Sequence, residues 1–153
     1  MSEEMSVTLI EGTQGLSDPA ELAWAFPDVN AGQAPFGGRV IVQLRRVKKT
    51  VNGGRIILVA ETKESEKWNN MIGKVISVGP LAFKNRETMA SWPEGSWAEV
   101  GDYVRIPRWG GDRWERAVPG EDGGEDPVLF MTINDHELIA RVTDDPLSFK
   151  AFI

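Results

Sequence analysis

The stretch from Arg39 to Leu44 reads RVIVQL, and residues 73–80 read GKVISVGP. Both segments are short, rich in β-branched residues and bounded by glycines or charged residues, which is typical of β-strands. From Pro35 onward the apolar residues keep a period of two, so the same structure is expected for the segments that follow. Further strands are predicted at residues 100–106, 113–118, 128–133 and 137–142. The predicted fold class is all-β, an irregular barrel with long loops.

Two turns with glycine are predicted within this pattern. Val100-Gly101-Asp102 leads into the strand that ends at Ile106, and residues 109–112 contain two adjacent glycines. The segment 113–118 is therefore predicted to be the hairpin mate of the strand that ends at Ile106.

Residues 1–34 form a predicted N-terminal extension with one short helix. Asp18 is a suitable N-cap, Pro19 suits the first helical position, and Glu21 completes a capping box. The apolar face of this helix consists of Leu22, Ala25 and Phe26. The helix either docks on the β-domain or acts as a partner-binding peptide.

The composition limits the kinds of partner. The chain has 17 Lys and Arg residues against 23 Asp and Glu residues, a net charge of -6, so it lacks the positive charge that attracts phosphate backbones or anionic lipid. We expect no nucleic-acid or membrane partner. The absence of cysteine excludes disulfides, thiolate nucleophiles and Cys-zinc sites. The first residues lack the basic and apolar regions of a signal peptide, so a cytoplasmic location is expected.

The segment 51–73 differs from the strands around it. It holds the turn sequence NGG at 52–54, the aliphatic triplet IIL at 56–58, and then residues rich in charge and amide groups. An aliphatic triplet on a segment too polar to form its own core is suited to binding another protein. The alternative is an ordinary core strand over residues 55–60, paired within the barrel.

The order of these segments resembles the GroES family of co-chaperonins. The resemblance covers residues 35–142, and five motifs occur in the family's order. The similar segments are an opening strand at 35–42, the mobile-loop triplet at 56–58, a Gly-x-Val-x-x-Val-Gly strand at 73–79, the Val-Gly-Asp turn at 100–102, and the ending at 128–131 and 135–142.

The chain also departs from the family's pattern. The loop after the triplet is longer than usual, and residues 81–99 and 119–127 are enlarged. This divergence is similar to that of a bacteriophage-encoded member. The resemblance implies a mobile loop at about 50–72, a roof region at about 80–99 and a C-terminal tail at 143–153.

The resemblance implies a ring of seven subunits that caps a GroEL-type chaperonin and encloses an unfolded client protein. The residues implied to contact the chaperonin are Gly53, Gly54, Ile56, Ile57 and Leu58. Such a protein is not an enzyme and needs no cofactor or metal of its own, because the chaperonin hydrolyses the ATP. The alternative function is that of a viral structural or assembly β-domain that uses the same loop for protein–protein binding.

A ring also requires contact between neighbouring copies. The resemblance implies that the first strand of one copy pairs with the last strand of the next. The residues implied at this interface are Val40, Val42, Leu138, Ile139 and Val142. The alternative is that both strands are fully paired within one chain.

Three other groups of residues are candidate sites. Arginines at 105, 108, 113 and 116 alternate with Trp109 and Trp114 as on a single-strand-binding surface, but acidic neighbours offset their charge and a packed hairpin is preferred. The acidic residues at 121, 122, 125 and 126 lack the spacing of a calcium loop. His136 is the only histidine, and a capping or surface role is expected for it.

Overall fold

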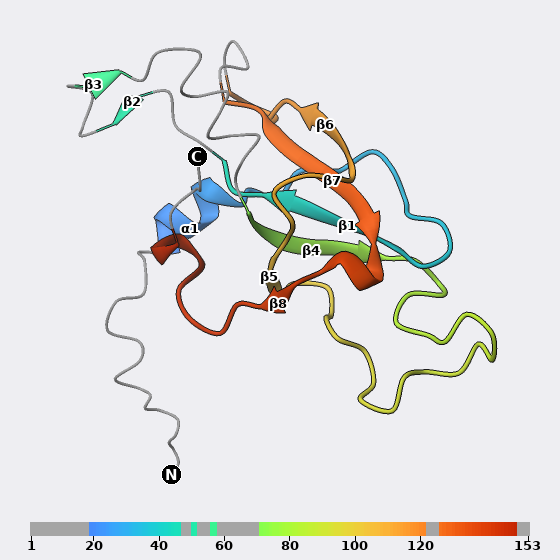
Figure 1. Cartoon of the computed structure of the whole chain (residues 1–153). Helices are drawn as coiled ribbons and strands as arrows, with labels where there is room; N and C mark the ends of the chain where they lie inside the picture. The colour runs from blue at the N-terminus through green and yellow to red at the C-terminus, as the bar shows by residue number, and fades with distance from the viewer. Residues whose placement is uncertain (1–18, 47–49, 52–55, 58–70, 122–125, 150–153) are drawn as a thin grey trace.

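The computed structural model describes residues 19–46, 50–51, 56–57, 71–121 and 126–149 (Figure 1). It contains one short helix and a predominance of β-strands, which confirms the predicted β-rich class. The elements are α1 (Pro19–Ala25), β1 (Arg39–Leu44), β2 (Thr50–Val51), β3 (Ile56–Ile57), β4 (Ile72–Val78), β5 (Tyr103–Arg105), β6 (Asp112–Arg116), β7 (Val128–Asn134) and β8 (Ala140–Arg141), with 3-10 helices at Asp135–Glu137 and Pro146–Ser148. The helices of this described part of the chain are too short or too polar to cross a lipid bilayer.

Six of the strands form one antiparallel sheet. Their order is β6-β7-β1-β4-β5-β8, so β1 is an internal strand and β6 and β8 lie at the two edges. β1 pairs with β4 on one side and with β7 on the other. Among the described residues no pairing joins β6 to β8, so the strand ladder stays open at these two edges.

β1 is buried on both of its faces, which explains its nearly continuous apolar sequence. Val40, Val42 and Leu44 point into the larger core cluster. Ile41 points to the opposite face, into a second cluster that the N-terminal residues Val29 and Ala31 help to cover. Because strand side chains alternate between faces, a strand with two covered faces needs apolar residues at successive positions.

The structure explains why glycine is required at two positions of the sequence motifs, Gly79 and Gly101. Gly101 has φ +100°, a conformation that favours glycine. It lies in the predicted turn, where the Asp102 side chain accepts a hydrogen bond of 2.9 Å from the Glu99 amide. Gly79 lies against the backbone before β1. A Cβ on Gly79 would be only 2.2 Å from the carbonyl oxygen of Gly37 and 2.9 Å from that of Arg39.

The predicted hairpin mate of β5 is wrong, because β6 pairs with β7 and not with β5. The aromatic rings of Trp114 on β6 and Phe130 on β7 stabilise this pairing. Trp114 stacks on its cross-strand neighbour Phe130 with ring centroids 5.8 Å apart, and its indole N–H donates to the Ala31 carbonyl at 2.8 Å. The last predicted strand is also shorter than expected, since only Ala140–Arg141 is extended and paired, after a 3-10 helix at Asp135–Glu137.

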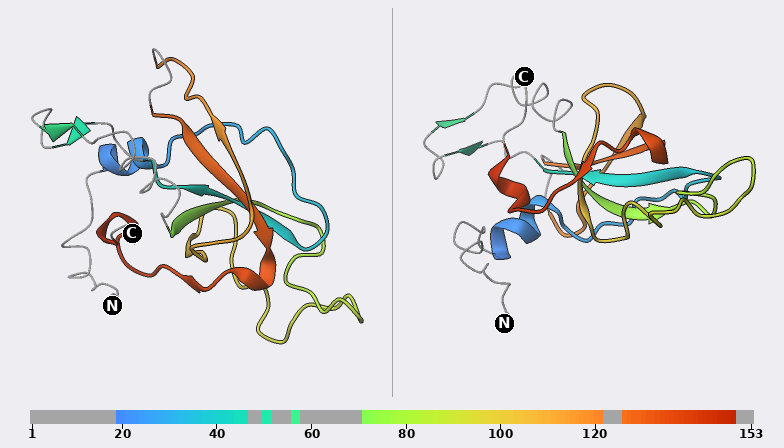
Figure 2. Two further views of the ribbon diagram at one scale, coloured as in Figure 1. Left: turned by 45° about the horizontal axis from the view of Figure 1, so that its top comes forward. Right: turned by 60° about the horizontal axis from the view of Figure 1, so that its bottom comes forward.

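The N-terminal helix docks on the domain, as the first of the two sequence-based alternatives has it. Ala25 and Phe26 are buried with Ile72, and the Phe26 ring meets Tyr103 edge to face at 5.1 Å. At the opposite end of the sheet from α1, residues 80–99 form a long excursion (Figure 2). This excursion has one β-bridge, Lys84 with Ser91, and buries Phe83 in the main core.

Candidate docking hairpin and its anchor

The predicted docking residues lie partly on a small hairpin. β3 pairs with β2 in an antiparallel two-stranded sheet, with Thr50 opposite Ile57 and Val51 opposite Ile56. This sheet is separate from the six-stranded sheet and lies at the α1 end of the molecule in both figures (Figures 1 and 2). The backbone of Ile56 and Ile57 is therefore not a strand of the main sheet, which argues against the alternative of a core strand. Gly53, Gly54 and Leu58 lie outside the described residues.

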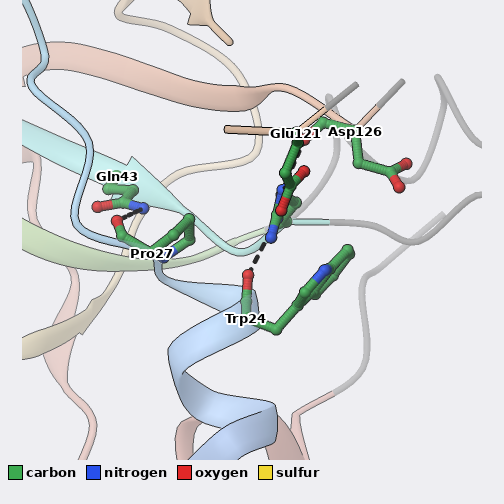
Figure 3. A network of polar contacts seen from close by, with 6 residues as sticks. Trp24, Pro27, Gln43, Glu121 and Asp126 are labelled. Carbon is green, nitrogen blue, oxygen red and sulfur yellow. Dashed lines mark hydrogen bonds and ion pairs between the residues drawn. The ribbon is translucent and has the colours of Figure 1, made fainter. Parts of the chain in front are cut away.

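The chain reaches this hairpin from the end of β1 through Arg46, whose side chain is only 2% exposed. Its Nε donates to the Trp24 carbonyl at 3.0 Å, and its guanidinium lies 4.0 Å from the Trp24 ring centre. Its Nη1 forms an ion pair with Glu121 at 2.7 Å and donates to the Asp126 carbonyl at 3.1 Å. Figure 3 shows this network between α1 and the connection from β6 to β7.

Two residues near Arg46 in the chain, Arg45 and Gln43, make similar contacts to distant segments. Arg45 donates through Nη1 to the carbonyl of Phe149 at 2.8 Å, which ties the C-terminal segment to the end of β1. Gln43 donates to the Pro27 carbonyl at 2.8 Å, at the end of the N-terminal helix segment (Figure 3). Three segments distant in sequence thus converge where the chain leaves the main sheet for the hairpin. We call Gln43, Arg45 and Arg46 the hairpin anchor.

The hairpin anchor is not predicted by the patterns of the sequence. Arg45 and Arg46 directly follow the predicted strand 39–44, and the local pattern indicates no partner for either residue. An available signal was their position, since an arginine that directly follows a two-faced buried strand is close to the core and needs partners there.

We predict that Arg46→Met lowers the free energy of unfolding by about 2–4 kcal/mol, because charge-assisted hydrogen bonds are worth roughly 1.5–3 kcal/mol each and the packing of the aliphatic stem is retained. Glu121 is part-exposed, which limits the penalty of leaving it unpaired. Urea unfolding followed by circular dichroism measures the change. Arg141→Met on the exposed edge strand β8 is the matched control and should change stability by less than about 0.5 kcal/mol. Equal stability of the two variants would show that the anchor contributes nothing.

Most of the residues expected at a subunit interface are packed within the chain's own core and are therefore not free to contact another copy. Val40 and Val42 are 0% exposed core residues, and both edges of β1 are hydrogen-bonded within the chain. The expectation that the first strand pairs with another copy does not fit this structure. The alternative of pairing within one chain holds for β1, whereas the last strand, β8, keeps one open edge among the described residues. Leu138 and Val142 are partly buried against their own core clusters, whereas Ile139 is 57% exposed.

The tryptophans and arginines of residues 105–116, His136 and the acidic cluster do not form a common site in the described part of the chain. Trp114 packs against Phe130 within the sheet, while Trp109 is 70% exposed with the Arg108 guanidinium 5.2 Å from its ring centre. His136 lies on a 3-10 helix with its side chain 64% exposed. Of the acidic cluster, Glu121 is paired with Arg46, and residues 122–125 lie outside the described part. Within that part, no group of three His, Cys, Asp or Glu residues could hold a metal ion.

Burial shifts two pKa values. Burial raises the pKa of the Tyr103 phenol above its ordinary value. Burial also lowers the pKa of Arg113 from its usual high value. Neither shift arises from a nearby ionisable partner, so neither identifies an acid–base pair.

Comparison with protein-family models finds no family that matches the chain, and comparison with curated proteins finds no similar sequence.

Proposed function

We propose that the chain is a co-chaperonin that docks on a GroEL-type chaperonin through the hairpin formed by β2 and β3 and the residues that follow it. The observation that supports this proposal is the separation of Ile56 and Ile57 from the six-stranded sheet, on a hairpin of their own. Aliphatic residues on a paired segment outside the core sheet are one means by which a protein binds an apolar groove of a partner. The GroES resemblance supplies the identity of that partner.

The free energy of docking favours several copies over one. Burying three aliphatic side chains contributes about 5–9 kcal/mol, at roughly 1.5–3 kcal/mol each. Each residue that must become ordered costs about 1–2 kcal/mol, and the existing pairing of β2 with β3 reduces this cost. Association entropy opposes a single contact further. Several hairpins on one ring share a single cost in association entropy and act at high effective concentration. Weak individual contacts therefore add up to strong but reversible binding.

The ring would be a homo-oligomer, with seven copies by the resemblance. Because β1 is internal, contact between copies falls to the edge strands β6 and β8, which are the unpaired edges of the described sheet. Addition of β8 of one copy to β6 of the next is a head-to-tail contact, and such contacts form a ring when the rotation between copies closes. Ile139, exposed beside β8, is the one residue of the expected interface that suits this arrangement.

In this function the chain is not an enzyme and carries no cofactor. The chaperonin hydrolyses ATP, and the ring encloses an unfolded client protein in the cytoplasm, which is the host cytoplasm if the protein is viral. The hairpin anchor has a part in this function, because it holds the end of β1 from which the chain continues toward the hairpin.

Co-sedimentation with a GroEL-type chaperonin tests this proposal. We expect the chain to sediment with the chaperonin when ATP is present and to remain in the supernatant without nucleotide. Failure to sediment under either condition contradicts the proposal.

The second candidate function is a viral structural or assembly protein that uses the same hairpin. The observation that favours it is the same separation of the hairpin from the six-stranded sheet, which does not depend on the identity of the partner. Co-purification with capsid or tail particles, together with no binding to chaperonin, supports this second function.

A further inference from the structure

A pocket of about 310 Å³ lies between the start of β1 and the excursion at 80–99. Three cationic side chains line it, those of Arg39, Lys84 and Arg86, and none of its lining residues is acidic. The whole chain carries a net charge of -6. Positive charge is therefore concentrated at this pocket against the overall charge of the protein.

Two acidic residues close to the pocket, Asp135 and Glu137, accept hydrogen bonds from backbone amides. Asp135 is 5% exposed, and its two carboxylate oxygens accept hydrogen bonds of 2.7 Å from the amides of Phe83 and His136. Glu137 accepts a hydrogen bond of 2.9 Å from the Asn134 amide. These hydrogen bonds hold both carboxylates in the turn that follows β7. Neither carboxylate lines the pocket, whereas the three cationic side chains do.

The pocket also has an apolar wall. Leu81 and Met89 line it, and they are 40% and 54% exposed. Both residues belong to the same excursion as Lys84 and Arg86. A ligand that meets the cations would therefore also cover exposed apolar surface, which contributes in proportion to the area buried.

The loop that carries these residues is held in shape before any ligand binds. The Asn85 amide donates to the Ala90 carbonyl at 2.8 Å, and the Met89 amide donates to the Asn85 carbonyl at 2.7 Å. Met89 has φ +63°, a left-handed conformation that is costly for a residue with a side chain. Its side chain is exposed, so burial in the core does not offset this cost. Strain of this kind is typical of ligand-binding loops.

We propose that this pocket binds a small organic anion, a carboxylate or phosphate attached to a short apolar group. The anionic group is held by Arg39, Lys84 and Arg86, and the apolar group packs on Leu81 and Met89. The volume lies at the lower end of the range for small-molecule sites. The proposal does not depend on the docking hairpin, which lies at the other end of the sheet (Figure 2).

Titration of the full chain, followed by amide shifts in NMR spectra at constant ionic strength, tests this site. The probes are phenyl phosphate, inorganic phosphate and phenol, with 4-phenylbutyrate as the carboxylate counterpart of phenyl phosphate. We expect phenyl phosphate or 4-phenylbutyrate to shift amides at 37–39, 81–89 and 134, and to bind at least about tenfold more tightly than inorganic phosphate or phenol. Shifts confined to other regions, or equal binding of all four probes, overturn the proposal.

Two variants separate this site from general charge effects. The double variant Lys84→Gln with Arg86→Gln should weaken binding at least about tenfold, whereas the control Arg141→Gln, an exposed arginine on β8, should not change it. Met89→Gly should remove the preference for the organic anion over inorganic phosphate without lowering the melting temperature, because glycine favours the same backbone conformation. Unchanged affinity in the double variant contradicts the site, whatever the result with Met89→Gly.

Discussion

Ile57→Asp is expected to abolish binding to a GroEL-type chaperonin while the six-stranded sheet stays folded. The substitution removes about 1.5–3 kcal/mol of apolar burial and places a carboxylate in an apolar groove, so each hairpin loses roughly 3 kcal/mol or more. That is a loss of about a hundredfold for one hairpin, and it is repeated in every copy of a ring. Co-sedimentation in the presence of ATP is the measurement.

The fold should survive this change because Ile57 pairs with Thr50 outside the main sheet. The matched control is Val100→Asp, which places the same charge on an aliphatic residue that is 63% exposed and lies in the turn before β5. Val100→Asp should co-sediment as the unchanged chain does. If Ile57→Asp still co-sediments at the normal level, the hairpin is not the docking element.

Gly79→Ala is expected to lower the free energy of unfolding by about 3–5 kcal/mol. Its new Cβ would lie 2.2 Å from the Gly37 carbonyl oxygen, so backbone has to move by more than an ångström. That movement strains two hydrogen bonds, from the Gly79 amide to the Arg39 carbonyl at 2.8 Å and from the Leu81 amide to the Gly37 carbonyl at 2.9 Å. Thermal and urea unfolding measure the loss.

Gly38→Ala is the control for this steric effect. The nearest atom to its new Cβ is the end of the flexible Arg86 side chain at 3.2 Å, which can move aside. We expect a loss of less than about 1 kcal/mol for Gly38→Ala. A similar small loss for Gly79→Ala would mean that residues 37 and 79 do not lie in close contact in solution.

The local pattern of the sequence was sufficient for the internal strands and the turn at Gly101. β1, β4 and β7 have enough β-branched residues at successive positions to be identified without tertiary information. The helix Pro19–Ala25 was also predictable, because its start and its stop are both encoded by nearby residues.

Strand partners were harder to predict, since they depend on contacts between distant residues. The pairing of β6 with β7 rests on Trp114 and Phe130, and the internal position of β1 rests on two partners far along the chain. The same reason explains why the interface residues Val40 and Val42 were misplaced. A strand sequence does not distinguish a core position from a subunit interface, because both require apolar side chains.

The hairpin anchor and the cationic pocket were missed for a related reason. Arg46 meets Trp24, Glu121 and Asp126, which are separated from it by 22 to 80 positions. The pocket brings Arg39 next to Lys84 and Arg86, which lie more than 40 positions further along the chain, and Gly79 packs against the backbone at Gly37 beside it. Charged residues that appear unremarkable along the sequence become sites when the fold brings them together.

Native mass spectrometry of the chain, alone and with a GroEL-type chaperonin and ATP, tests the central claim most directly. The account predicts a ring of seven copies that adds as one unit to the chaperonin when ATP is present, and no such addition for Ile57→Asp. A chain that remains monomeric and adds no mass to the chaperonin with ATP would contradict the account.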